Sequence, residues 1–545
     1  MESLEKYFDV AFAAPEGIKK LRELILTLAM QGKLVPQDPN DQPVSELLRK
    51  IDAEKRQLVK AGKIRQPKPL PEIKSEEVPY ELPESWSWVR LNDFGTWKSG
   101  STPSRTNSSY FGGDIPWVKS GEVKQGRIWK TEEMITKSAL ENCSLDINPI
   151  GSVLIAMYGA NIGETGVLEI EATTNQAVCA CKTFCGVDNK FLARLISSLK
   201  QDFISQGAGA AQPNISREKI INTLAPLPPF AEQKRIVTRI DQLMTRCDEL
   251  EKLRTEREQK RLTVHISALN SLLEAQEPDS FAAVWHFINR HFAELYSVKE
   301  NVTELRKAIL QLAVMGKLVP QDSNDQPASE LLKEIEVEKL RLVKEGKIKQ
   351  QKPVPEVNPA DVLYALPLGW EWVRFGNISI NRDGERIPVS KDDRNKVQGE
   401  YDYYGASGII DKVNDFIFDK DLLLIGEDGA NLINRSTPIA FIASGKYWVN
   451  NHAHVIDAHD FQLLLYLEKY FNAIDLKPYV TGTAQPKMNQ AKMNSILVAL
   501  PPLAEQHRIV AKIDQLMALS DKLEQQIDAT TCKQSTLLNA VMAHT

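Results

Sequence analysis

The sequence predicts an α+β protein in which two globular domains are separated by two long antiparallel helical (coiled-coil) regions, with pseudo-two-fold symmetry and a cyclic arrangement of the chain. Two internal repeats support this. The segment Ile25–Ile51 recurs as Ile309–Ile335 with 20 of 27 positions identical, and Pro228–Glu251 recurs as Pro501–Glu524 with 16 of 24 identical. The segments between the repeats differ from each other. A long internal repeat fixes an architecture before any local pattern does.

Composition limits the class of protein. The chain has 545 residues, 42% of them apolar, and a net charge of −5. No apolar run approaches the roughly 20 residues that span a bilayer, and the acidic start MESLEKYFDVAF lacks a signal-peptide pattern, so we expect a cytoplasmic protein. Cys179, Cys181 and Cys185 have no histidine nearby, which favours reduced thiols over a metal site. The acidic balance is unusual for a protein that binds nucleic acid unaided.

The repeated arm is predicted to hold two helices. Apolar residues at three-to-four spacing begin a helix at Ile18, and Gly32 ends it. Ser45 is the expected N-cap of a second helix that runs through Leu58 and stops at Gly62. A proline-rich connector follows, and the second copy repeats the whole order.

Residues 86–227 and 370–500 alternate short β-like runs with Gly- and Pro-containing turns, which indicates two independent α+β or β-rich domains. Within the first, Phe191–Gln206 is expected to be one helix.

A long helix is expected over residues 230–273, at about 1.5 Å per residue roughly 65 Å, and again after Pro502. Their apolar stripes include Leu250 and Leu253 and need partner helices. We expect residues 231–345 to form one helical layer, and residues 18–60 and 503–543 to form the matching layer. The insert 276–300 has no counterpart, and its apolar residues are predicted to pack on the frame: Phe281, Trp285, Phe287, Ile288, Phe292 and Leu295.

The chain therefore divides into an N-terminal helical arm (1–80), a first globular domain (81–229), a central helical region (230–362, with the insert 276–300 and the repeated arm 302–362), a second globular domain (363–502) and a C-terminal helical region (503–545).

Catalytic signatures are missing from the sequence. It has no P-loop, no dinucleotide-binding glycine triplet and no zinc-protease helix motif. Leu227-Pro-Pro-Phe resembles the Asp/Asn-Pro-Pro-Tyr/Phe motif of amino-methyltransferases, but Leu227 and its equivalent Leu500 cannot accept a hydrogen bond from an amino group. Both segments are interpreted as helix starts. His452 and His454 alternate along an expected strand, where packing or base contact is favoured over catalysis.

Several motifs carry a resemblance to a known family, the specificity (S) subunits of type I restriction–modification systems. They are GGDIPWVKSGEV (112–123), YYGASGIID (403–411), LPESWSWVRL and LPLGWEWVRF (from 82 and 366), LIAMYGANIG (154–163) with LLIGEDGAN, GAGAAQPNIS (207–216) and TGTAQPKMN (481–489). The GKLVPQDPNDQP arm is similar to one subclass with a long N-terminal arm. The turn Glu427–Asp428–Gly429 departs from the usual arginine-plus-glycine form.

The resemblance implies a non-catalytic subunit of a DNA adenine methyltransferase and restriction endonuclease. Each globular domain would be a target-recognition domain that reads one half of a bipartite site in double-stranded DNA, and the helices would set the gap and dock partners. The implied partners are two modification subunits, which carry S-adenosylmethionine, and two restriction subunits, which are ATP-dependent and use Mg²⁺ to translocate and cut DNA. No cofactor is expected in this chain.

Polar side chains able to meet base edges give the predicted DNA-binding residues: Lys119, Ser120, Glu122, Tyr158, Asn161, Gln212, Asn214 and Ser216 in the first domain, and Tyr404, Ser407, Asn431, Asn451, His452, Gln485, Lys487 and Asn489 in the second. Two other readings stay open, a standalone bipartite DNA-binding regulator and a protein–protein scaffold. No catalytic or metal-binding residue is predicted.

Overall fold

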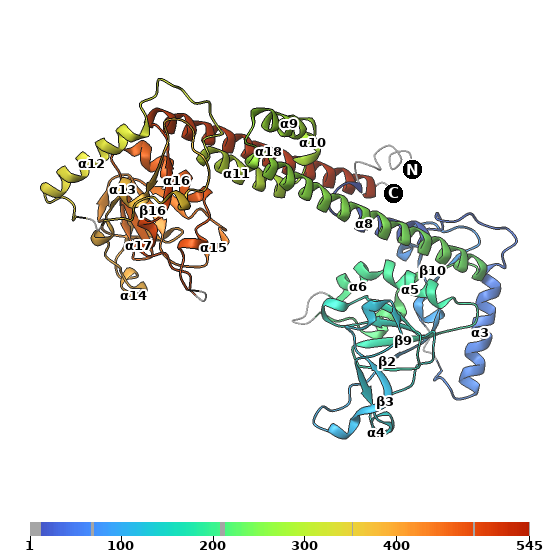
Figure 1. The fold of residues 1–545 in the computed structure, drawn as a ribbon. Helices are drawn as coiled ribbons and strands as arrows, with labels where there is room; N and C mark the ends of the chain where they lie inside the picture. The colour runs from blue at the N-terminus through green and yellow to red at the C-terminus, as the bar shows by residue number, and fades with distance from the viewer. Residues whose placement is uncertain (1–11, 67–69, 208–212, 351–352, 483–484, 544–545) are drawn as a thin grey trace. The chain divides into compact units, whose positions relative to one another are not determined.

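A computed structural model describes residues 12–66, 70–207, 213–350, 353–482 and 485–543 (Figure 1). The chain divides into two compact units, Met1–Glu256 with Thr531–Thr545, and Arg257–Thr530. The division falls within the two longest helices, α8 (Phe230–Glu274) and α18 (Leu503–Ala543). Each unit therefore contains one globular head and a part of each long helix.

Head 1, residues 87–227, contains three sheets. Their strand orders are β1-β10, β2-β9-β6-β7-β4 and β5-β3-β8. The strands are β1 (Ser87–Arg90), β2 (Gly95–Ser99), β3 (Phe111–Val118), β4 (Arg127–Ile128), β5 (Glu133–Ile135), β6 (Val153–Ala156), β7 (Thr165–Leu168), β8 (Thr173–Thr174), β9 (Val178–Thr183) and β10 (Leu224–Leu227). Its helices are α4 (Lys137–Asn142), α5 (Asn189–Ser198), α6 (Lys200–Gly207) and α7 (Arg217–Asn222). The helix predicted over Phe191–Gln206 is thus two helices, interrupted at Leu199.

Head 2, residues 371–500, repeats this arrangement. Its strand orders are β11-β20, β12-β19-β16-β17 and β14-β13-β18-β15. The strands are β11 (Glu371–Arg374), β12 (Ile380–Asn381), β13 (Gln398–Gly405), β14 (Gly408–Val413), β15 (Phe418–Asp419), β16 (Leu422–Gly426), β17 (Ala440–Ala443), β18 (Lys446–Val449), β19 (Ala453–Asp457) and β20 (Leu497–Leu500). Its helices are α13 (Phe375–Ile378), α14 (Lys391–Arg394), α15 (Asn431–Asn434), α16 (Phe461–Ala473) and α17 (Gln490–Asn494).

The arms form the predicted helix pairs, α2 (Gly17–Met30) with α3 (Val44–Lys60), and α11 (Lys299–Val314) with α12 (Ala328–Lys344). Gly32 and Gly62 follow their helices with φ of 71° and 69°, the left-handed conformation that a glycine adopts without strain. The predicted N-cap is wrong: α3 begins at Val44 after Pro43, so Ser45 lies in the first turn. The extended φ and ψ of Pro43 already fit the position before a helix.

The first helix of each arm, α2 or α11, packs against both long helices. In unit 1, Arg22 of α2 binds Asp248 and Glu251 of α8 at 2.6 and 2.9 Å, while Leu24 shares a small core with Leu538 of α18. In unit 2, Arg306 of α11 binds Asp521 and Glu524 of α18 at 2.6 and 2.8 Å, and the end of α8 joins the core of α11.

The two ends of the chain meet in unit 1. Phe12 and Ala14 are buried in one small core with Leu538 near the end of α18. This contact confirms the cyclic arrangement predicted from the order of the repeats.

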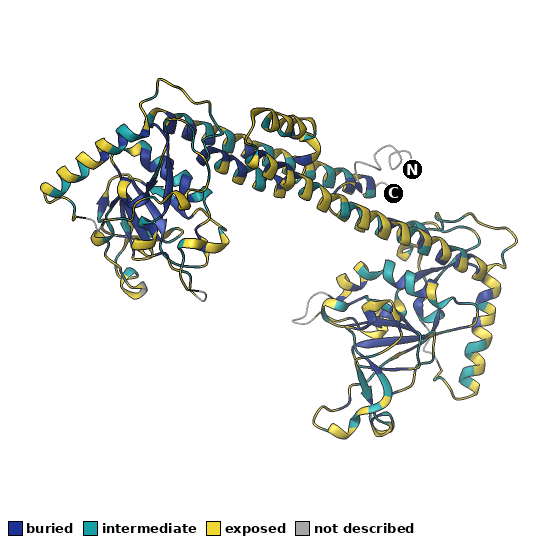
Figure 2. Ribbon diagram, viewed as in Figure 1, coloured by how far each residue is buried: buried dark blue, intermediate teal, exposed yellow. Residues whose placement is uncertain are grey.

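The predicted apolar stripe of α8 is partly wrong. Leu250 and Leu253 are 48% and 61% exposed, whereas Cys247 is buried and Arg254 donates to the Ala14 carbonyl at 2.9 Å. The buried face therefore passes through Cys247 and Arg254, and the two leucines lie beside it. Figure 2 shows that exposed residues cover much of α8.

The insert forms α9 (Pro278–Arg290) and α10 (Phe292–Leu295). Ile288 and Leu295 are buried against the end of α8, as predicted, and Phe281 packs at the edge of that core. Trp285, Phe287 and Phe292 are 40–47% exposed, so packing does not explain these three.

A buried tryptophan fixes each head to the start of a long helix. The Trp86 indole N–H donates to Glu232 of α8 at 2.9 Å, and that of Trp370 donates to Glu505 of α18 at 2.9 Å. Burial raises the pKa of both carboxyls above the ordinary value. The tryptophans of the WSW and WEW motifs thus join heads to frame.

Candidate nucleic-acid interface

One surface turn of head 1 gathers predicted DNA-binding residues from distant parts of the sequence. After β6, the Met157 N–H donates to the Ala177 carbonyl at 2.8 Å, and the Gly159 N–H donates to the Pro213 carbonyl at 2.9 Å. Tyr158 forms an isolated antiparallel bridge with Asn214. We call residues 158–161 and 213–216 bridge site 1.

Head 2 builds the same turn with other side chains. The Glu427 N–H donates to the His452 carbonyl at 2.8 Å, and the Gly429 N–H donates to the Pro486 carbonyl at 3.0 Å. Asp428 bridges Lys487. Residues 427–431, 485–489 and His452 form bridge site 2.

The shared hydrogen bonds establish a position-by-position correspondence between the sites. Asp428 takes the place of Tyr158, Lys487 that of Asn214, and His452 that of Ala177. The paired motifs of the sequence already align Tyr158 with Asp428 and Asn214 with Lys487, and the hydrogen bonds add the equivalence of Ala177 and His452.

The remaining predicted residues of head 1 have mixed environments. Tyr158 is exposed, Asn161 is half-buried in the same turn, and Ser216 accepts the Lys219 N–H at 3.3 Å as the N-cap of α7. Gln212 lies outside the described residues.

Lys119, Ser120 and Glu122 form a separate turn after β3. Glu122 is 4% exposed and accepts the backbone N–H groups of Lys119 and Glu132, both at 2.8 Å. Hydrogen bonds to Glu132 and Glu133 raise the pKa of Lys119. A base contact by Glu122 would require these turn-forming bonds to break.

Head 2 shows a similar mixture. Asn451, Gln485 and Lys487 are exposed at bridge site 2, and Ser407 is exposed in the turn between β13 and β14. Tyr404 is half-buried. The final predicted residues both form local structure: Asn431 accepts the Thr437 N–H at 3.1 Å, and Asn489 accepts the Lys492 N–H at 3.0 Å as the N-cap of α17.

A buried ionic cluster supports bridge site 2. His454 is 1% exposed, its Nδ1 lies 2.6 Å from Asp383 Oδ2, and its Nε2 lies 2.9 Å from the Met488 carbonyl oxygen. Because a carboxylate and a carbonyl both only accept, both ring nitrogens donate and the ring is an imidazolium. Burial opposes this charge, but the hydrogen bond to Asp383, the charges of Asp383 and Glu427 and the hydrogen bond to the Met488 carbonyl together outweigh it and raise the pKa of His454.

The carboxylates of this cluster are held ionised. Burial would raise the pKa of Asp383 and Glu427, but the hydrogen bonds from His454 and Arg386, respectively, lower both. Arg386 donates to Glu427 at 2.8 Å, and Lys487 Nζ lies 3.2 Å from the other oxygen of Glu427.

In head 1 the position that corresponds to His454 is occupied by a neutral residue, Cys179. Cys179 pairs with Ile155 of β6, as His454 pairs with Ile425 of β16. Cys179 pairs with Ser99 of β2, and the Oγ of Ser99 lies 4.0 Å from the Sδ of Met157. Burial raises the pKa of the Cys179 thiol to about 12, against the opposing charge of nearby Arg217, so the residue that takes the place of His454 is uncharged in head 1.

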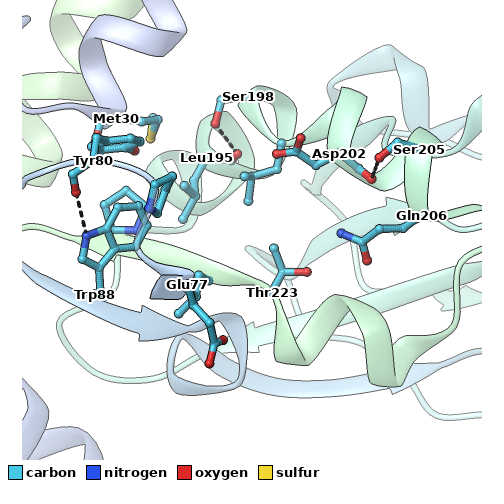
Figure 3. A pocket seen from close by; sticks show the side chains of 14 residues that line it. Met30, Glu77, Tyr80, Trp88, Leu195, Ser198, Asp202, Ser205, Gln206 and Thr223 are labelled. Atoms are coloured by element: carbon cyan, nitrogen blue, oxygen red, sulfur yellow. Dashed lines mark hydrogen bonds between the residues drawn. The ribbon is translucent and has the colours of Figure 1, made fainter. Parts of the chain in front are cut away.

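Head 1 also contains a cavity of about 360 Å³ away from bridge site 1. Figure 3 shows Tyr80 and Trp88 at one end of it and Ser198 and Asp202 of helices α5 and α6 on another side. Counted from the capping residues Asp188 and Asp460, Ser198 corresponds to Tyr470 of head 2.

Tyr470 is buried and its hydroxyl donates to the Leu497 carbonyl at 2.9 Å. The cavity of head 1 is therefore the space that a tyrosine fills in head 2.

The described part of the chain has no cluster of three metal-ligating residues and no helix long and apolar enough to cross a membrane. The six cysteines are free thiols.

Comparison with known proteins identifies the family to which the chain belongs. A family model for the type I restriction modification DNA specificity domain matches residues 83–259 and 367–530. The chain belongs to the specificity subunits of type I restriction enzymes.

Two relatives match nearly the whole length. The EcoAI specificity subunit of Escherichia coli is 34% identical over 96% of this chain and 92% of its own, and the EcoEI specificity subunit of Escherichia coli is 32% identical over 96% and 93%. A solved HsdS subunit from Thermoanaerobacter tengcongensis is 18% identical, covers 85% of this chain and 97% of its own, and superposes with a TM-score of 0.41. The family model and the two curated relatives confirm the specificity-subunit resemblance stated from the motifs.

Sequence patterns missed Asp428 of bridge site 2, and Asp383 and Arg386 of the ionic cluster that supports it. The only signal was the departure of Glu427–Asp428–Gly429 from the usual turn. Asp383 and Arg386 had none, because the pairing of β12 with β19 joins segments about 75 residues apart.

Proposed function

We propose that this chain selects the DNA sequence for a type I restriction–modification complex and does no chemistry itself. Each head reads one half of a bipartite site in double-stranded DNA, and the helical frame sets the gap between the halves. One observation carries the proposal: two unlike heads present the same backbone turn, with different side chains, on a repeated frame in a chain of this family.

The repeated frame supports partners that occur twice. Arg22 and Arg306 make matching ion pairs in the two units, as do Arg235 and Arg508 with Asp41 and Asp325. Equal surfaces suit two copies of one modification subunit, which would bring S-adenosylmethionine and methylate adenine. Two restriction subunits using ATP and Mg²⁺ would complete the nuclease, and the complex would act on DNA in the cytoplasm.

Partner binding also accounts for the charge of the chain. A net charge of −5 gives little long-range attraction to phosphates, and phosphate neutralisation supplies much of the affinity for DNA. The modification subunits would provide that basic surface, while the heads provide the choice of sequence.

Long-read methylome sequencing of cells with and without this chain, in the presence of the modification subunit, tests the proposal. We expect a bipartite methylated motif that disappears without the chain. Methylation that persists without the chain would contradict it.

Measurements on the purified chain distinguish the other readings. The chain alone should bind no S-adenosylmethionine and should gain DNA affinity with the modification subunit. Tight, sequence-specific binding by the chain alone would favour a standalone regulator, and binding to polypeptides without any DNA affinity would favour a scaffold.

A further inference from the structure

The correspondence between the bridge sites allows a statement about bases, and it rests on the proposed function. The two sites have the same backbone hydrogen-bond pattern, but the equivalent position holds Asn214 in head 1 and Lys487 in head 2. A difference in target between the heads should therefore show most directly at this position.

The formal charges of the acidic and basic side chains around Lys487, apart from the imidazole of His452, sum to zero. The cations are Lys487, Arg386 and the His454 imidazolium, and the anions are Asp383, Glu427 and Asp428. Asp428 is 16% exposed and both its oxygens lie within 2.9 Å of His452 Nδ1. His452 therefore binds the carboxylate of Asp428 at the surface and acts as a positioning residue.

A neutral site is a poor match for a phosphate, because carboxylates beside the lysine oppose an anion. It suits the uncharged edge of a base. The side chain of Lys487 is 53% exposed, and its Nζ lies 3.2 Å from Oε1 of the more buried Glu427. The lysine is therefore an oriented donor with no acceptor of its own.

Only one base edge in the major groove presents two adjacent acceptors and no donor, the N7 and O6 of guanine. An asparagine amide presents a donor and an acceptor together, which matches N6 and N7 of adenine. We propose that bridge site 2 reads a guanine through Lys487 and that bridge site 1 reads an adenine through Asn214.

The test uses the full chain in complex with its modification subunit and a set of duplexes that carry single base changes in each half-site. Lys487→Asn should lose about ten- to hundredfold of discrimination at one guanine of one half-site, and Lys487→Arg should keep that preference because arginine reads the same edge. The other half-site should be read as before. Lys477→Asn, at an exposed lysine of head 2 outside the site, is the matched control.

Asn214→Lys in head 1 gives an independent arm that does not depend on the folding of a head 2 variant. It should remove one adenine preference in the other half-site, because a lysine has no acceptor for the N6 hydrogen of adenine. Unchanged preferences in these variants would overturn the inference, as would a uniform loss of affinity with a smaller salt dependence, which marks a phosphate contact. If the unaltered complex selected no bipartite sequence, the proposed function would fail instead.

Discussion

Replacing Trp86 by phenylalanine tests how firmly head 1 is held on α8. The substitution keeps most of the buried ring but removes the indole N–H, which donates to Glu232 at 2.9 Å. Glu232 is fully buried, and Gln37 at 2.7 Å would remain its donor. A hydrogen bond to a charged group contributes about 1.5–3 kcal/mol, so we expect local stability to fall by about 2 kcal/mol.

Hydrogen exchange suits the measurement, because unfolding of a chain with several domains has no single free energy. Peptides covering β1 and β10 should exchange about 30-fold faster, since 1.4 kcal/mol corresponds to a factor of ten. Peptides of β11 and β20 should not change. Trp370→Phe should show the opposite distribution, and unchanged exchange of β1 and β10 in Trp86→Phe would refute the reasoning.

Three further predictions concern the heads and the frame. Raising the pH from 6 to 9 should speed exchange at the β16–β19 pair of head 2, because the pKa of His454 is raised above 6.5 and its contribution is lost as the pH passes that raised value, whereas Cys179 at the β6–β9 pair of head 1 stays neutral; parallel pH profiles of intrinsic-rate-corrected exchange at the two strand pairs would contradict this. Ser198→Tyr should stabilise head 1 by about 1 kcal/mol by filling its cavity, measured as slower exchange in α5, and faster exchange there would show that the space cannot accept the ring. Arg306→Met should weaken the α11–α18 contact by about 1 kcal/mol at low salt and less at high salt; a salt-independent change in exchange of α11 would count against the ion pairs.

The frame was predictable from sequence because its signals are local. The helix expected over 230–273 is Phe230–Glu274, since no proline or glycine interrupts the segment and Pro228 and Pro229 mark its start. Gly32 and Gly62 end their helices for a reason confined to one residue. Side-chain preference predicts Ser45 as the N-cap, but the helix begins at Val44, after the extended backbone of Pro43.

Tertiary contacts were not predictable in the same way. Leu250 and Leu253 fit a helical stripe, yet the face that is buried depends on where the end of the chain, at Ala14, meets α8. Trp285 is likewise a residue type common in protein cores, but it does not lie on the face of the insert that is buried through Ile288 and Leu295.

The candidate site was recovered only in part for a related reason. Tyr158, Asn214, His452 and Lys487 are predicted from residue types able to meet base edges, and the structure brings them into two equivalent turns. The charge that supports one of these turns depends on strand register, which neither composition nor periodicity specifies.

One experiment addresses the central claim, that each head reads its own half-site on an equivalent frame. Residues 87–227 are replaced by a copy of residues 371–500, and the methylated motif of the resulting complex is mapped. The account predicts a target in which the half-site of head 2 occurs on both sides of the gap. A motif that still contains the half-site of head 1 would contradict it.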